Sequence, residues 1–229
     1  MSEQVHSELR AYSDAPALFS PHPLFENFGE RVERSEACVR LGLDPANRYV
    51  LFFGLIRDYK GLDLLLDAWA QLRRAGRTEG RRLIVAGEFY TAREPYLNRI
   101  ADNGLQDEVL LHDRFIPDDD VKYYFSAADF VVQPYKTATQ SGVTQIAYQF
   151  CVPMVVTKVG GLAEIVPDGR VGYVCEPTPE GVAGAIERMY EGDTLQRFRE
   201  NCVEERRRFS WEEMCSRITE LYGLVASGK

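Results

Sequence analysis

Two glycine-containing turns in the stretch from Val131 to Val166 could bind an anion. The first, Ser141-Gly142, follows a short apolar run and directly precedes a helical pattern. The first N–H groups of a helix lack partners within it, and the helix dipole is positive at that end, so this turn offers donors to a phosphate. The second, Gly160-Gly161, follows the next apolar run, where glycine lets the backbone come close to a ligand. Two such turns at one edge of a parallel sheet suggest a phosphorylated ligand.

A repeating pattern of strands and helices must position these turns. Between residues 49 and 174, short apolar runs bounded by Gly, Pro or Asp alternate with segments of helical periodicity. Continuous apolar runs are typical of parallel strands buried on both faces. The expected strands are Tyr49–Phe53, Leu83–Ala86, Val109–Leu111, Phe130–Val132, Met154–Val156 and Tyr173–Val174. The alternation predicts an α/β fold with an open, Rossmann-like, doubly wound parallel sheet, whose ligand lies beyond the carboxyl ends of the strands.

The two ends of the chain differ from this central pattern. Ser20-Pro21-His22-Pro23 predicts a stiff extended linker, because each proline keeps the residue before it out of the helical region. We interpret His22 as a linker histidine rather than a catalytic residue. From Pro179 the chain is helical, and Ser210-Trp211-Glu212-Glu213 has the pattern of a capping box that opens a last helix. We expect residues 1–28 to be a residual N-terminal segment and linker, and residues 29–229 to form one domain.

Composition and charge exclude several classes of protein. The 229 residues carry a net charge of −8, which argues against a general nucleic-acid binder. The five cysteines form no CxxC pair, which favours reduced thiols in the cytoplasm and no metal site of that kind. There is no signal peptide and no apolar run of about 18 residues, so membrane contact is expected to be peripheral if it occurs.

Three segments of the chain resemble one known family. They are FFGLIRDYKGLDLLLDAW, QPYKTATQSGVTQIAYQFCVPMVVT and VGGLAEIVPDGRVGYV, and they occur in the family's order. The chain resembles the C-terminal, donor-binding half of retaining glycosyltransferases of the two-domain GT-B architecture, in particular glycosyltransferase family 4. The resemblance implies a single GT-B half-domain with C-terminal helices. It also implies an N-terminal acceptor-binding domain, which is expected to be missing from this sequence.

The resemblance assigns two catalytic cations in the loop after the first strand. A departing diphosphate needs positive charge as the sugar bond breaks, and Arg57 and Lys60 are placed to supply it. Lys60 stands at the family's usual lysine position. Leu55 occupies the family's usual arginine position, and Arg57 follows two residues later. Lys60 therefore matches the family pattern more closely than Arg57 does. The alternative interpretation is that both are solvated loop cations without a catalytic role.

The central motif departs further from the family pattern. The family usually has two acids eight positions apart, and these positions fall on Ala138 and Ile146. The loop that replaces them is rich in hydroxyl and amide groups, which can hydrogen-bond to sugar and phosphate oxygens without charge. The departure leaves phosphate binding by the helix N-terminus intact, but it removes the expected carboxylates near the sugar and the ribose.

The remaining donor-binding residues are expected in loops at the carboxyl edge of the sheet. Glu164 either faces the donor or is an acid in the first turn of a helix, where the dipole favours it. The expected donor-binding set is Gly54, Glu88, Arg114, Phe115, Ile116, Thr139, Gln140, Ser141, Gly142, Val143, Gly160, Gly161 and Glu164.

The resemblance implies transfer of a sugar from a nucleotide-diphosphate sugar to an acceptor with retention. No metal or other cofactor is expected, since metal-ligand spacing is missing. No GxGxxG motif follows any expected strand, which argues against a dinucleotide-binding reductase. The main alternative is a nucleotide-sugar-binding or partner-docking module without turnover. A less favoured one is a nucleotide-sugar epimerase of the same architecture.

Overall fold

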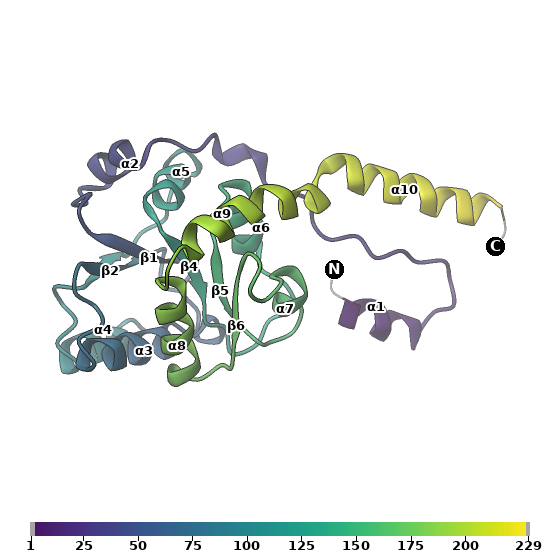
Figure 1. Ribbon diagram of the computed structural model, residues 1–229. Helices are drawn as coiled ribbons and strands as arrows, with labels where there is room; N and C mark the ends of the chain where they lie inside the picture. Colours follow the sequence, from purple (N-terminus) through teal and green to yellow (C-terminus); the bar gives the residue numbers. More distant parts are fainter. Residues whose placement is uncertain (1–2, 228–229) are drawn as a thin grey trace.

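The computed structural model describes residues 3–227, which contain one parallel six-stranded sheet (Figure 1). The strands are β1 (Arg48–Phe53), β2 (Arg81–Ala86), β3 (Val109–His112), β4 (Phe130–Gln133), β5 (Met154–Thr157) and β6 (Gly172–Cys175). Their order is β3-β2-β1-β4-β5-β6. The order reverses between β1 and β4, and ligands of such sheets bind beyond the carboxyl ends at that point. The predicted Rossmann-like fold is confirmed.

Helices cover both faces of the sheet (Figure 1). The helices on one face are α2 (Arg34–Leu41), α5 (Asp118–Ala127) and α6 (Gly142–Gln149). Those on the other face are α3 (Leu62–Arg74), α4 (Glu94–Asp102) and α8 (Pro179–Met189). The short helix α7 (Leu162–Ile165) follows β5, and α9 (Thr194–Glu205) contacts both α8 and α6.

Burial on both faces explains why the strands read as continuous apolar runs. Along β1, Val50 and Phe52 join the apolar cluster beneath α3, whereas Tyr49 and Leu51 join the cluster on the opposite face. All four side chains are at most 1% exposed. The six expected strands are present. Each is longer than expected by one or two residues, because main-chain pairing continues past the apolar run, as it does between Arg48 and Arg81.

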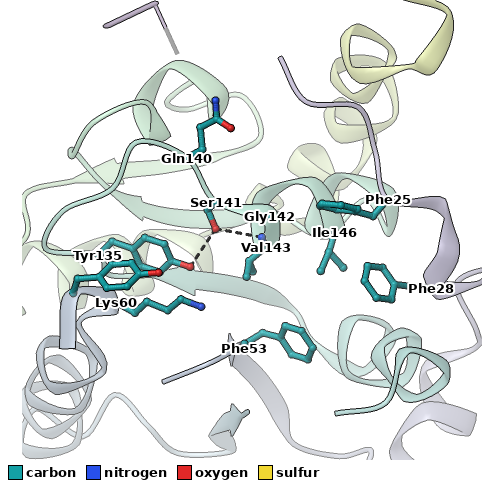
Figure 2. Close-up of a pocket in the computed structure, with 12 residues that line it drawn as sticks. Phe25, Phe28, Phe53, Lys60, Tyr135, Gln140, Ser141, Gly142, Val143 and Ile146 are labelled. Atoms are coloured by element: carbon teal, nitrogen blue, oxygen red, sulfur yellow. Dashed lines mark hydrogen bonds between the residues drawn. The ribbon is translucent and has the colours of Figure 1, made fainter. Parts of the chain in front are cut away.

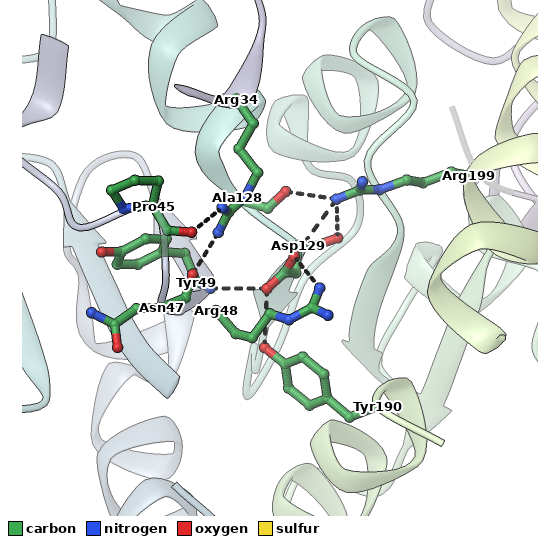
Figure 3. A network of polar contacts seen from close by, with 9 residues as sticks. All are labelled: Arg34, Pro45, Asn47, Arg48, Tyr49, Ala128, Asp129, Tyr190 and Arg199. Carbon is green, nitrogen blue, oxygen red and sulfur yellow. Dashed lines mark hydrogen bonds and ion pairs between the residues drawn. The ribbon is translucent and has the colours of Figure 1, made fainter. Parts of the chain in front are cut away.

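A buried carboxylate ties the sheet together at its amino edge (Figure 3). One side-chain oxygen of Asp129 accepts a hydrogen bond from the Tyr49 N–H at 2.9 Å. The guanidinium groups of Arg48 and Arg199 lie 3.5 Å and 3.9 Å from its other oxygen. Arg199 also donates to the main-chain oxygen of Ala128. A cavity of about 490 Å³ opens beside this network. The buried carboxylate is paired with both guanidinium groups and with a main-chain N–H, so we assign this edge a structural role.

The terminal helices lie away from the sheet (Figure 1). Helix α10 (Trp211–Ala226) begins at Ser210, whose side chain accepts a hydrogen bond from the Glu213 N–H as the capping pattern predicts. None of its residues is buried. An extended segment connects α1 (Glu3–Arg10) to the domain. Within residues 3–227, no helix is both long and apolar enough to cross a bilayer.

The segment before residue 29 is more closely attached to the domain than expected. Leu24 is 8% exposed and belongs to the apolar core, and its N–H donates to the main-chain oxygen of Phe209 at 2.9 Å. Phe25 and Phe28 pack against the same core. These apolar side chains gain by leaving water, so the packed domain begins before residue 29, the start predicted from the sequence.

The core cluster beneath α3 generates a stability prediction. Leu66 is fully buried, so Leu66→Ala should lower the free energy of unfolding by about 2–5 kcal/mol through lost burial and a residual cavity. Val39→Ala is the control, because Val39 is 80% exposed on α2 and its truncation should change stability by less than about 0.5 kcal/mol. Urea unfolding of the two variants measures the difference. Similar losses in both would contradict this description of the core.

Candidate functional site

The carboxyl edge of the sheet carries two adjoining cavities. The larger one, which we call the α6 cavity, has a volume of about 330 Å³ and lies between the loop after β1 and the N-terminus of α6 (Figure 2). Its lining residues are Phe25, Phe28, Phe53, Gly54, Tyr59, Lys60, Tyr135, Gln140, Ser141, Gly142, Val143 and Ile146. It therefore combines one cation, one helix N-terminus and several aromatic rings.

The N-terminus of α6 is fixed by a side-chain cap. Ser141 is the N-cap residue, with extended backbone angles, and its Oγ accepts a hydrogen bond from the Val143 N–H at 3.2 Å. The same oxygen lies 3.1 Å from the Tyr135 hydroxyl, and the Thr144 hydroxyl donates to the Ser141 carbonyl at 2.6 Å. The predicted helix start at Ser141-Gly142 is confirmed, and its positive dipole end faces the cavity.

Lys60 brings a positive charge to the same cavity from the opposite side. It ends the short helix η2 (Asp58–Lys60), and its Nζ lies 5.9 Å from the centre of the Tyr135 ring. Burial, followed by the nearby charge of Arg57, lowers the pKa of Lys60 to about 8. An ammonium group with so little water around it gains more from a bound anion than an exposed one would.

The smaller cavity, which we call the Phe115 cavity, shares three lining residues with the α6 cavity: Phe28, Phe53 and Gly54. Its volume is about 170 Å³. The other lining residues are Leu55, Gly87, Glu88, Phe115, Ile116, Asp118 and Val121. One elongated ligand can thus contact the α6 N-terminus at one end and the loops after β2 and β3 at the other.

These two cavities include nine of the residues that the sequence singled out. The α6 cavity holds Lys60 together with Gln140, Ser141, Gly142 and Val143, and Gly54 lines both cavities. The Phe115 cavity adds Glu88, Phe115 and Ile116. Apart from Lys60, these groups are neutral side chains, one acid and main chain, which suits a ligand held through many hydrogen bonds and apolar contacts.

The other predicted residues do not line either cavity. The guanidinium of Arg57 lies over the Tyr90 ring, 5.2 Å from its centre. Arg114 lies close enough to Tyr124 for its charge to oppose the rise that burial causes in the Tyr124 pKa. Glu164 lines a separate cavity with Arg208 and Arg217. Of the predicted residues, Thr139, Gly160 and Gly161 also lie outside the two linings.

Gly160 nevertheless shapes the loop before α6. Its φ is +47°, and a Cβ placed there would lie 1.5 Å from the main-chain oxygen of Ala138. Only glycine allows the loops after β4 and β5 to approach so closely. The second glycine-containing turn thus supports the first rather than contacting a ligand in the α6 cavity.

Sequence reasoning missed the aromatic part of the site. Tyr59, Tyr135 and Phe53 line the α6 cavity, as do Phe25 and Phe28 from the segment expected to be linker. The apolar spacing of residues 24, 25 and 28 was a signal that this segment packs against the domain. The His22 ring packs against Phe25 at a tilt of 33°, with ring centres 4.8 Å apart, and lines a small neighbouring cavity with Gln140 and Ser141.

His112, at the end of β3, has a structural role. Its Nδ1 lies 2.8 Å from the hydroxyl of the buried Tyr124, and burial lowers its pKa. No cluster of three or more His, Cys, Asp or Glu side chains in the described part of the chain is arranged to hold a metal ion.

Comparisons with solved structures agree with this fold. Sucrose-phosphate synthase from Thermosynechococcus elongatus superposes with a TM-score of 0.82 at 22% identity, over 100% of this chain and 58% of that one. Anabaena HepE, solved in complex with UDP and glucose, has a TM-score of 0.68 at 21% identity, over 87% of this chain and 55% of that one. At these identities the likeness concerns the fold.

Sequence comparisons identify the family. D-inositol 3-phosphate glycosyltransferase 2 of Catenulispora acidiphila is 32% identical over an alignment of 237 positions, which covers 96% of this chain and 54% of that protein. This chain spans about half the length of the curated relatives it matches. Residues 47–192, which include all six strands and both loops around Lys60 and Ser141, match the family model of glycosyl transferases group 1. The chain therefore belongs to the glycosyl transferases group 1 family.

Proposed function

We propose that this chain is the donor-binding half of a retaining glycosyltransferase that uses a nucleotide-diphosphate sugar. The observation that carries the proposal is that Lys60 and the N-terminus of α6 share one cavity. A half-buried cation opposite a positive helix end suits a group with two adjacent negative charges, and a diphosphate is such a group. The UDP bound to HepE, a protein of the same fold, agrees with a nucleoside diphosphate here.

The proposed roles divide the ligand between the two cavities. The diphosphate lies in the α6 cavity, and the base lies in the Phe115 cavity against Phe115 and Ile116. The ribose then passes Gly54, one of the three residues that both cavities share. Ile146, which stands at one of the two positions where the family usually has an acid, lines the α6 cavity. The ligand therefore meets an apolar side chain there instead of a carboxylate.

In the proposed reaction the bond between the sugar's anomeric carbon and the diphosphate oxygen breaks, and its electron pair stays on that oxygen. Lys60 and the main-chain N–H groups at the start of α6 stabilise the charge that develops there. The positive charge of Arg57 also stabilises the departing diphosphate from a position near Lys60, since that charge is close enough to lower the Lys60 pKa. An acceptor hydroxyl attacks the same face of the sugar, so the configuration is retained, and its proton passes to the departing diphosphate oxygen.

The acceptor is proposed to bind to a second domain. The curated relatives are about twice as long as this chain, which leaves room for an acceptor-binding half. The cytoplasm remains our proposed location, since all five cysteines are free thiols. The rival proposal is a binding module without turnover, and it predicts no transfer even when the acceptor-binding half is supplied.

Removal of Lys60 tests the assignment of the diphosphate site. Lys60→Ala deletes a charge-assisted contact worth about 1.5–3 kcal/mol, so the nucleoside diphosphate should bind roughly tenfold to more than a hundredfold more weakly. Titration calorimetry with UDP, GDP and ADP identifies the best ligand and measures this loss. Lys158→Ala is the matched control, because Lys158 is exposed at the end of β5 and lines neither cavity. Equal binding by a folded Lys60→Ala variant would contradict the assignment.

The lowered pKa of Lys60 predicts how affinity depends on pH. In the free protein this group loses its proton near pH 8, whereas a bound diphosphate raises its pKa again. Binding therefore takes up a proton above pH 8, and affinity should fall by up to about tenfold per pH unit between pH 8 and pH 10. Lys60→Arg should flatten this profile, because arginine stays protonated. A flat profile in the parent protein would show that Lys60 does not meet the diphosphate.

We expect the chain of 229 residues to bind a donor without transferring its sugar at an appreciable rate. Transfer needs an acceptor held at attack distance from the donor, and in two-domain enzymes domain closure provides this. Release of nucleoside diphosphate from UDP-, GDP- and ADP-sugars, with and without acceptor mixtures, measures turnover. Robust sugar transfer by the purified chain would contradict this prediction.

A further inference from the structure

Lys136 connects the loop that carries Lys60 to the loop that leads into α6, and it lines neither the α6 cavity nor the Phe115 cavity. It lies in the loop between β4 and α6, and its Nζ contacts Asp58 Oδ1 at 2.8 Å and Asp63 Oδ2 at 2.9 Å. Asp58 begins the short helix η2 that ends at Lys60, and Asp63 lies in the first turn of α3. The two acids therefore flank Lys60 in the chain, and one lysine from the opposite loop holds both.

Main-chain contacts accompany this bridge. The Lys136 N–H donates to the Tyr59 carbonyl at 2.7 Å. A Cβ on Gly61, whose φ is +68°, would lie only 2.0 Å from the Pro134 carbonyl oxygen, so the two loops touch on both sides of Lys60. The loop after β1 thus depends on the loop after β4 for its position.

Tyr135 extends this connection to the N-terminus of α6 (Figure 2). Its ring faces the Lys60 Nζ and meets the Tyr59 ring edge-on at 6.0 Å, while its hydroxyl lies 3.1 Å from Ser141 Oγ. The Thr157 hydroxyl holds the Tyr135 carbonyl at 2.6 Å. Lys136 and Tyr135 are adjacent, so a shift of this loop moves Lys60 and the helix cap relative to each other.

Direct contact between Lys136 and the diphosphate is disfavoured by its surroundings. Its single positive charge is already matched by two carboxylates within 3 Å, so the three groups together carry a net negative charge. An anion gains nothing from approaching such a cluster. The ammonium acts on the loop that carries Lys60 rather than on the ligand.

We propose that Lys136 is a positioning residue, which sets the distance between Lys60 and the N-terminus of α6 by bridging Asp58 and Asp63. This inference rests on the proposed binding of a nucleoside diphosphate in the α6 cavity. Lys136 is thereby a determinant of diphosphate affinity that touches no ligand atom.

The test measures binding of the best ligand among UDP, GDP and ADP by titration calorimetry. Lys136→Met should weaken binding roughly tenfold. This is the lower end of the range for removing a residue that orients a metal ligand, and Lys136 is proposed to orient Lys60 in a comparable way. Lys136→Arg can bridge the same carboxylates, so it should restore affinity to within about threefold of the parent. In the Lys60→Ala background, Lys136→Met should weaken binding by less than about twofold, because the group it positions is gone.

Asp63→Asn separates positioning from a direct electrostatic effect. It removes a negative charge near an anion site, so simple Coulomb attraction predicts tighter binding, whereas loss of the bridge predicts weaker binding. We expect binding to weaken about threefold to tenfold, with Asp67→Asn as the control. Asp67 lies one turn further along α3 and pairs with Arg99 instead. Unfolding curves for each variant confirm that binding is measured on folded protein.

Two results would overturn the inference: unchanged affinity in a folded Lys136→Met variant, or tighter binding by Asp63→Asn. If Lys136→Met does not fold, the Lys136→Arg and Asp63→Asn arms still decide the question. A parent protein that binds none of the three nucleoside diphosphates would instead overturn the proposed function on which the inference rests.

Discussion

The burial of the parallel sheet on both faces is the constraint on which the rest of this structure depends. In this fold, helical crossovers connect the strands and return the chain to the starting edge, so all six strands run in one direction. Every loop that follows a strand then emerges at the same edge. Lys60 and Ser141 are 81 positions apart in the chain, yet they line one cavity because β1 and β4 are neighbours.

The site balances few charges against many neutral contacts. Lys60 is the cation in the α6 cavity, and burial keeps its proton weakly held. The surrounding groups are hydroxyls, amides and aromatic rings. Such a site does not attract anions strongly from a distance. Under the proposed function, an anionic ligand would pair with an ammonium group that burial has already partly desolvated.

The strands, the cap at Ser141 and the position of Lys60 could be predicted, because each depends on a pattern within a few consecutive residues. Apolar runs identify buried strands, and a serine before a helical segment identifies a cap. The placement of Arg57 over Tyr90 and the separate cavity of Glu164 could not be predicted, since both follow from side-chain directions in loops. The packing of Phe25 could not be predicted either, because it depends on Gly142, a partner more than 100 positions away in the sequence.

The hydrogen bond between the Leu24 N–H and the Phe209 carbonyl joins the segment that enters the domain to the segment that leaves it. One follows the extended linker and the other leads directly into α10. The two segments therefore meet at one place, beside the cavity that Phe25 lines. A displacement of this junction would therefore reach the wall of the α6 cavity through Phe25, the residue next to Leu24.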